Sequence, residues 1–254
     1  MGWIMEKAEL LKAIDERTSR RHYVSEPIEP EKVSQLQIAI TEYNKEQGIR
    51  FELVLNNGKA FSDFMPDYGM FPGVHNYICL VHEKKAENSL EKLGYFGELL
   101  VLRATNLKLD TCWVGGGFKR EDVPISLAEN EDIACIIIIG KAVAGKSFRE
   151  MAIRGLTHSK GKRKSIEDLF EADASVPDWF LQGMQAVSKA PSSRNGQPVL
   201  FHYKDGKTTA TVEEKLGHKG LIQLLDFGIA KLHFELGATN PGKWNWGNGG
   251  EFDM

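Results

Sequence analysis

Apolar residues recur every three or four positions in several stretches of the chain, which is the spacing of one helix face. In the first stretch Leu10, Leu11 and Ile14 share such a face. The second begins at Pro30 and stops before Gly48, two residues that suit the first turn and the end of a helix. We therefore predict helices over residues 6–16, 30–47, 87–107, 178–189 and 217–236, and a short helix over residues 165–170.

Shorter apolar runs between these stretches indicate buried strands. The strongest run covers residues 133–139 and stops at Gly140. It is far too short to cross a bilayer. Turn signals at Asn57-Gly58 and Asp205-Gly206 follow or separate strand-like runs. We predict strands over residues 51–55, 76–81, 133–139, 199–203 and 208–212, a glycine-rich turn over 112–118, and an irregular connection over 143–157.

The chain carries signs of an internal repeat. Residues 97–113 and 228–244 each read as a helix, a polar turn and a tryptophan, and both ends give one offset (228 − 97 and 244 − 113 are 131). An Arg-x-Ser sequence occurs at residues 17–19 and at 163–165. A helix followed by tryptophan can also arise by chance. The shared order of landmarks predicts a tandem duplication, with a first half over residues 1–162 and a shorter second half over residues 163–254.

The composition is that of a soluble globular protein, with 42% hydrophobic and 26% charged residues among 254. A net charge of −3 offers no electrostatic basis for binding nucleic acid. Cys79, Cys112 and Cys135 form no Cys-x-x-Cys motif, so we interpret them as small buried hydrophobes in a reducing compartment. The sequence shows no secretory segment, membrane span or metal-ligand spacing. We expect a cytoplasmic protein with no metal site.

The stretch with the clearest chemistry is Ala190-Pro-Ser-Ser-Arg-Asn-Gly-Gln-Pro198, between a predicted helix and a predicted strand. Its hydroxyls and carboxamides do not titrate near neutral pH, so they suit a neutral polar ligand better than acid–base chemistry. The same residue types also make ordinary turns, because their side chains hydrogen-bond to nearby backbone. A plain helix-to-strand loop is therefore the alternative.

This stretch resembles the Pro-Ser-Ser-x-Asn-x-Gln-Pro loop of the FMN-dependent nitroreductase family. Residues 17–23, Arg-Thr-Ser-Arg-Arg-His-Tyr, resemble the family's opening Arg-Arg-Ser-x-Arg-x-Phe with conservative departures. The resemblance implies an α+β, nitroreductase-like fold with sheets flanked by helices. Family members are typically homodimers with flavin sites at the dimer interface. The first half of this chain has the opening and the second half has the loop, which predicts one composite site in a single-chain pseudo-dimer and favours a monomer.

The resemblance also implies roles for individual residues. An arginine and hydroxyl donors near the N-terminus, followed by a later basic pair, would hold the FMN phosphate. The loop would contact the flavin's pyrimidine edge and ribityl chain, and two glycines would let backbone amides approach flavin N5 and O4. The implied cofactor-binding residues are Arg17, Thr18, Ser19, Arg21, Gly115, Gly116, Lys162, Arg163, Pro191, Ser192, Ser193 and Asn195. A solvated basic cluster, a plain turn, and Arg163 as the degenerate opening of the second half remain alternatives.

The implied activity is FMN-dependent oxidoreduction. NADH or NADPH would reduce FMN, which would then reduce a small acceptor such as a nitro compound or quinone in a ping-pong cycle. The cofactor carries this chemistry, so no catalytic protein residue is predicted. One alternative is a degenerate pseudo-dimer that binds flavin or another ligand without turnover, with the Trp244–Trp246 tail filling a site. Another is a flavoprotein that does not reduce nitro compounds, such as a reductive dehalogenase or a flavin-storage protein.

Overall fold

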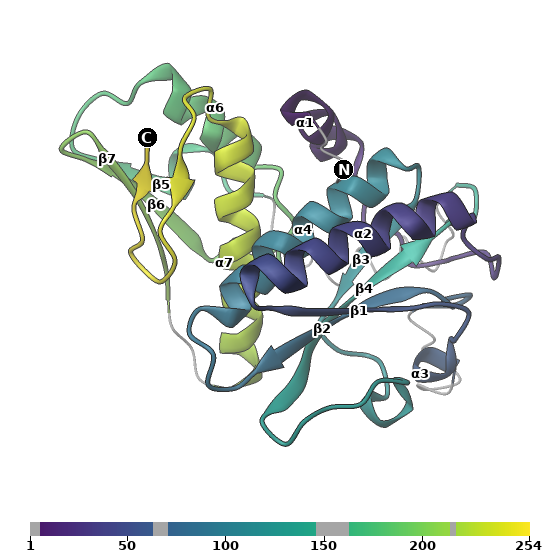
Figure 1. Ribbon diagram of the computed structural model, residues 1–254. Coiled ribbons are helices and arrows are strands. Elements are labelled where there is room, and N and C mark those ends of the chain that lie inside the picture. Colours follow the sequence, from purple (N-terminus) through teal and green to yellow (C-terminus); the bar gives the residue numbers. More distant parts are fainter. Residues whose placement is uncertain (1–5, 63–70, 146–162, 214–216) are drawn as a thin grey trace. The chain divides into compact units, whose positions relative to one another are not determined.

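A computed structural model describes residues 6–62, 71–145, 163–213 and 217–254 (Figure 1). The helices are α1 (Lys7–Glu16), α2 (Pro30–Gln47), α3 (Lys59–Ser62), α4 (Ser89–Asn106), α6 (Asp178–Val187) and α7 (His218–Gly237). The strands are β1 (Arg50–Val54), β2 (Tyr77–Glu83), β3 (Asp110–Val114), β4 (Glu131–Gly140), β5 (Phe170–Ala172), β6 (Val199–Lys204), β7 (Lys207–Val212), β8 (Lys243–Trp244) and β9 (Phe252–Asp253). Short 3₁₀ turns cover Arg120–Asp122, Glu167–Leu169 and Ser193–Asn195.

The described residues form two compact units, and the division falls within α4. Unit 1 consists of the described residues within 16–87 and 100–157, and unit 2 consists of those within 6–15, 88–99 and 158–254. The predicted duplication, with its boundary between residues 162 and 163, concerns the ancestry of the sequence. It stays a prediction.

Unit 1 is built on an antiparallel sheet with the order β1-β2-β4-β3. Both central strands are almost completely buried, which explains why β4 is apolar at nearly every position. The edge strand β1 is protected by α2, because the Asn44 carboxamide accepts from the Phe51 amide at 2.8 Å and donates to its carbonyl at 3.0 Å. A helix side chain thus takes the place of a neighbouring strand.

Unit 2 contains a smaller sheet in the order β5-β6-β7, in which β5 is parallel to β6 and β6–β7 is a hairpin. The helix α7 packs closely on its neighbours because of glycines. A Cβ at Gly228 would overlap the Glu91 carbonyl oxygen of α4, and one at Gly94 would overlap the carbonyl of Leu225. A Cβ at Gly183 of α6 would come within 2.8 Å of the Phe234 ring. These close approaches fix the depth of α7 against α6 and the first part of α4.

Charged side chains are buried inside unit 2. The Lys231 ammonium lies 2.5 Å from a Glu91 oxygen, and the other Glu91 oxygen accepts from the Gly247 amide at 2.7 Å. This pair fastens the C-terminal tail to α7 and α4. His233 is buried, and both of its ring nitrogens have partners: the Ala186 carbonyl at 3.0 Å and Glu98 at 3.1 Å.

The α+β prediction is confirmed, and the five long helices and five strands lie within a few residues of their predicted positions. Residues 112–118 are partly mispredicted, because Cys112–Val114 continue β3 and only the glycines bend away. The helix predicted over residues 165–170 is wrong, because Glu167–Leu169 form a 3₁₀ turn and Phe170 already begins β5. All three cysteines are buried and form no disulfide, which confirms their interpretation as small buried hydrophobes. Within the described part of the chain, no helix has the length and apolarity needed to traverse a lipid bilayer.

Candidate functional site

The loop over residues 190–198 holds a strained backbone. Arg194, Asn195 and Gln197 have φ angles of 51°, 56° and 44°, in the left-handed region that residues other than glycine seldom adopt. Each such residue costs about 1–3 kcal/mol, so the surrounding structure must stabilise the loop. Strain of this kind clusters at ligand-binding sites.

Hydrogen bonds inside the loop give it a defined shape. The Asn195 amide donates to the Ser192 carbonyl at 3.0 Å, and the Gln197 amide donates to the Ser192 hydroxyl oxygen at 3.0 Å. The Gln197 side chain donates to the Asn195 carbonyl at 3.3 Å. Gln197 therefore has a structural role in the loop. Ser193 and Arg194 are exposed at the tip of the loop.

Asp226 of α7 packs against the loop from the interior of unit 2. Both carboxylate oxygens lie 3.1 Å from the Ser193 amide nitrogen, which donates to them. Burial raises the pKa of the Asp226 carboxyl to about 8, although the hydrogen bond from Ser193 acts in the opposite direction. A cavity of about 20 Å³, which is enough for one water, is lined by Asp226, Ser192 and Gln197 among others.

Two consecutive basic residues hold the two ends of the loop. The Arg163 guanidinium donates to the carbonyls of residues 188–190, where α6 ends, at 3.1 Å for the last of them. A cation suits the carbonyls at a helix C-terminus. The Lys164 ammonium donates to the Gln197 carbonyl at 3.0 Å, and the Lys164 amide donates to the Gln197 side-chain oxygen at 3.3 Å.

In unit 1 the Arg-x-Ser segment lies against β3. Arg17 donates to the Ser19 hydroxyl oxygen at 3.3 Å, and Ser19 forms a parallel β-bridge with Thr111. Arg20 anchors the segment on its other side, because its guanidinium donates to the Val143 carbonyl at 2.7 Å. An arginine and a hydroxyl are thus held together at one point along β3.

The same strand leads directly to the predicted glycines. Gly115 follows Val114 at the end of β3, and a strand rise of roughly 3.3 Å per residue places it about 13 Å along the chain from Thr111. A Cβ at Gly116 would meet no atom within 4 Å, and its φ lies outside the left-handed region. Neither packing nor backbone conformation within the described chain requires glycine here. Close approach of a ligand would require it.

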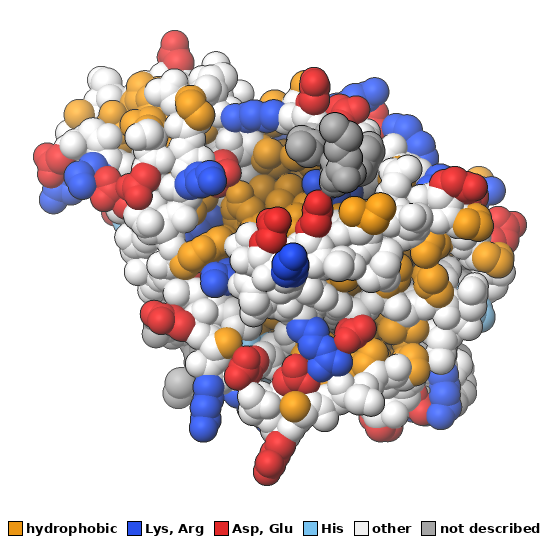
Figure 2. Space-filling model, in the orientation of Figure 1, with side chains coloured by type: hydrophobic (Ala, Val, Ile, Leu, Met, Phe, Trp, Pro, Cys, Tyr) orange, Lys and Arg blue, Asp and Glu red, His pale blue; other side chains and the backbone are white. Residues whose placement is uncertain are grey.

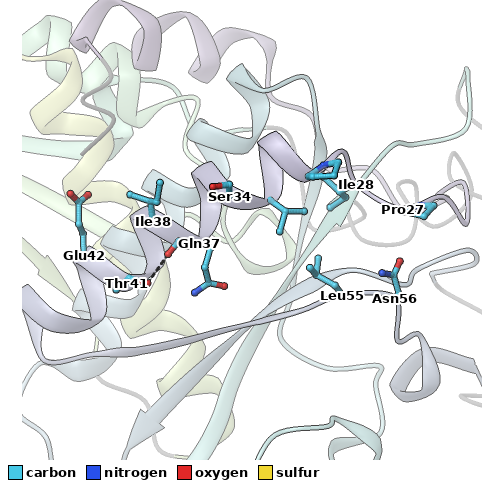
Figure 3. Close-up of a pocket in the computed structure, with 11 residues that line it drawn as sticks. Pro27, Ile28, Ser34, Gln37, Ile38, Thr41, Glu42, Leu55 and Asn56 are labelled. Carbon is cyan, nitrogen blue, oxygen red and sulfur yellow. Dashed lines mark hydrogen bonds between the residues drawn. The ribbon is translucent and has the colours of Figure 1, made fainter. Parts of the chain in front are cut away.

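A large open groove elsewhere in unit 1 does not suit a phosphate ligand. It has a volume of about 770 Å³ and lies between α2 and the end of β1 (Figure 3). Among the described residues that line it, Glu42 is the only charged one, and the Thr41 hydroxyl is used by the Gln37 carbonyl at 2.8 Å. A phosphate needs cationic donors.

Over the face shown in Figure 2, acidic and basic side chains are mixed, so no large patch of one sign appears there.

The described residues divide the predicted site into two groups. The group in unit 1 is Arg17, Thr18, Ser19, Arg21, Gly115 and Gly116. The group in unit 2 is Arg163, Pro191, Ser192, Ser193 and Asn195. Lys162 lies outside the described residues. The composite site concerns the relation between the two units and stays a prediction.

Sequence reasoning missed two residues that contact the loop, Asp226 and Lys164. One signal was available for Asp226, which interrupts the apolar run Leu224-Leu225-Asp226-Phe227 of a predicted helix. A charged residue on such a face is seldom buried unless it is paired. The pattern points to a buried carboxylate but does not identify its partner.

Comparisons with known proteins agree on one family. A family model named "Putative TM nitroreductase" matches residues 9–238. A solved "putative nitroreductase" from Thermotoga maritima aligns with a TM-score of 0.61 and 18% identity, over 98% of this chain and 94% of that chain. This likeness confirms the predicted nitroreductase-like fold. The search of curated proteins finds no match.

Two other solved structures align with parts of the chain. A nitroreductase family protein from Clostridium difficile has a TM-score of 0.48 and 17% identity, over 67% of this chain and 100% of that chain. A nitroreductase with bound FMN from Desulfitobacterium hafniense has a TM-score of 0.44 and 22% identity, over 56% of this chain and 93% of that chain. The family match itself spans most of the sequence, and the chain belongs to this nitroreductase family.

Proposed function

We propose that the protein is an FMN-dependent oxidoreductase that uses NADH or NADPH to reduce small acceptors such as nitro compounds or quinones. The observation that carries the proposal is the 190–198 loop, which keeps the family's Pro-Ser-Ser-x-Asn-x-Gln-Pro sequence. The protein holds this loop in a strained conformation that an ordinary connection would not need. Membership of a nitroreductase family supports oxidoreduction as the class of activity.

The chemistry of the two groups fits FMN. Ser192, Ser193 and Asn195 offer neutral donors and acceptors that match a uracil-like ring edge. Gly116 leaves room for a flat ring to approach the backbone. Arg17 and Ser19 offer a forked cation and a hydroxyl to a phosphate.

Each group would do a different part of the work. When bound, FMN supplies the hydride-transfer chemistry. Arg17 and Ser19, with Lys162 as a further candidate, would bind the phosphate end. The backbone amides of Gly115 and Gly116 would orient the ring, and the loop of unit 2 would hold its polar edge. Because the Pro-Ser-Ser-x-Asn loop occurs once in the sequence, we propose one FMN per chain and a monomer that needs no second copy for its site.

The first experiment is to purify the protein and titrate it with FMN. We expect saturable quenching of flavin fluorescence at one FMN per chain, and loss of the bound flavin's visible absorbance when NADH or NADPH is added without oxygen. Return of the absorbance with a nitro compound or quinone completes the cycle. Protein that takes up no FMN contradicts the proposal. Bound flavin that neither nucleotide reduces supports the alternative of a pseudo-dimer without turnover.

Two variants locate the site. Gly116→Val should weaken FMN binding about tenfold or more, which corresponds to about 1.4 kcal/mol, while leaving the melting temperature close to that of the wild type. Asn195→Asp keeps a residue type that tolerates a left-handed backbone and replaces the amide donor by a charge, so it should weaken binding to a similar degree. Asn240→Asp, at an exposed position of unit 2, is the matched control. Equal affinity in all of these proteins would remove the glycines and the loop from the site.

A further inference from the structure

The 190–198 loop is held from three directions by ionisable side chains, and only one of them, Arg163, has a predicted flavin role. Arg163 binds the carbonyls of residues 188–190, where the loop begins. Lys164 binds Gln197 near its end, and Asp226 binds Ser193 at its centre. We propose that these three residues are positioning residues, which hold the loop in its ligand-binding conformation without touching the ligand. The inference rests on the proposed function for the identity of the ligand.

The contact at the centre of the loop is the most specific. One amide of the loop, that of Ser193, is directed at both oxygens of Asp226 at 3.1 Å. Ser193 is followed directly by Arg194 and Asn195, which have left-handed backbones. A hydrogen bond at this point fixes the residue from which the strained segment departs.

The supports themselves are rigidly placed. Asp226 lies two residues before Gly228, where α7 approaches the Glu91 carbonyl too closely for any side chain. The helix α6, which leads into the loop, is packed on the same α7 through Gly183 and Phe234. The loop's entry and its central support therefore belong to one packed block of unit 2.

The predicted repeat offers an internal comparison. The offset of 131 residues that relates Gly97 to Gly228 pairs Asp226 with Tyr95. Under the predicted repeat, the first half has a tyrosine at the position of the carboxyl group, and it also lacks the Pro-Ser-Ser-Arg-Asn sequence. Loss of the loop together with its support is expected if the carboxylate serves the loop.

The contacts of Arg163 also favour this role over the phosphate-binding role that the family resemblance implies. Its guanidinium donates to three successive carbonyls at the end of α6. A fork can satisfy several carbonyls at once, whereas an ammonium acts as a single point charge. Arg163→Lys should therefore restore little of what Arg163→Met loses.

The effect on affinity follows from the population of the correct loop conformation. If only a fraction of molecules holds the binding-competent loop, the apparent dissociation constant rises by the inverse of that fraction. We expect Asp226→Leu and Arg163→Met each to raise the FMN dissociation constant about tenfold. Asp226→Asn retains one acceptor oxygen for Ser193 and should recover part of the affinity. The matched controls are Glu98→Gln, a buried acid of unit 2 bonded to His233, and Lys189→Met, an exposed cation paired with Asp15.

The test measures two quantities on each full-length variant. The first is the FMN dissociation constant from fluorescence quenching, and the second is hydrogen exchange of the loop amides in protein without FMN. We expect faster exchange at the Ser193 amide in Asp226→Leu, slight change in Asp226→Asn, and none in the controls. Unchanged exchange and affinity in both Asp226→Leu and Arg163→Met would overturn the proposal. If wild-type protein binds no FMN, the proposed function fails, while exchange at Ser193 still decides whether Asp226 holds the loop.

Discussion

Replacing Asp226 by Asn should change how the stability of the protein depends on pH. The carboxyl is buried in unit 2, and burial raises its pKa from an ordinary 3.8 to about 8. Asn has nearly the same shape and can accept from Ser193, but it does not titrate. The difference in unfolding free energy between wild type and Asp226→Asn therefore isolates the proton on this one group.

The sign and size follow from linkage. The folded protein binds the proton more tightly than the unfolded chain, so the stabilisation is fully present below about pH 4 and is lost as the pH rises through about 8. A shift of about four pH units, at 1.36 kcal/mol each, is on the order of 5 kcal/mol. Between pH 5 and pH 8 the difference should fall by about 4 kcal/mol, which is a large part of a typical folding free energy.

Urea unfolding followed by tryptophan fluorescence measures this difference, because Trp179 and Trp244 both belong to unit 2. The two proteins are compared at pH 5, 6, 7 and 8 with equal ionic strength. Wild type should lose stability relative to Asp226→Asn at every step. A difference that stays constant over this range would mean that Asp226 remains ionised when buried, and the reasoning from burial would be refuted.

The other expected outcomes concern packing and edge protection. In chemical denaturation, Lys231→Met should lower the unfolding free energy by about 3–5 kcal/mol, because Glu91 then keeps a buried charge without its partner. Adding Glu91→Gln should recover part of this loss, and losses in the two variants that simply add would contradict the pairing. Gly228→Ala should lower the melting temperature, because the added Cβ overlaps the Glu91 carbonyl and this outweighs the roughly 1 kcal/mol by which alanine favours a helix over glycine. A higher melting temperature would show that α7 can shift. Asn44→Ala should cost about 1–3 kcal/mol and speed hydrogen exchange at Phe51, whose backbone loses both partners; unchanged exchange would assign the edge's protection elsewhere.

The elements with a strong local signal are predictable from the sequence. Pro30 and Gly48 mark the ends of α2, so its bounds follow to the residue. The strand β3 is different, because Asp110–Val114 has no clear alternation and runs into three glycines. Its extended form comes from pairing with β4, residue against residue, over its whole length. Such a strand becomes visible only when its partner is known.

The site shows the same division between local and non-local information. The sequence identifies the 190–198 loop because its residues are adjacent in the chain. It does not identify Asp226, which lies 33 positions after Ser193 and meets it only through the packing of α7. The helical pattern around Asp226 predicts an apolar face and does not explain why an acidic residue occurs on it. The structure supplies the explanation, because Asp226 accepts a hydrogen bond from the Ser193 amide of the loop.

The conformation of the 190–198 loop depends on residues outside the loop. Arg194 and Gln197 have little intrinsic preference for a left-handed backbone, so the same loop sequence placed on other supports would adopt other shapes. The loop conformation is stabilised by contacts with Arg163, Lys164 and Asp226, which come from two separate segments of unit 2. The loop and these three side chains therefore act as one structural element of unit 2.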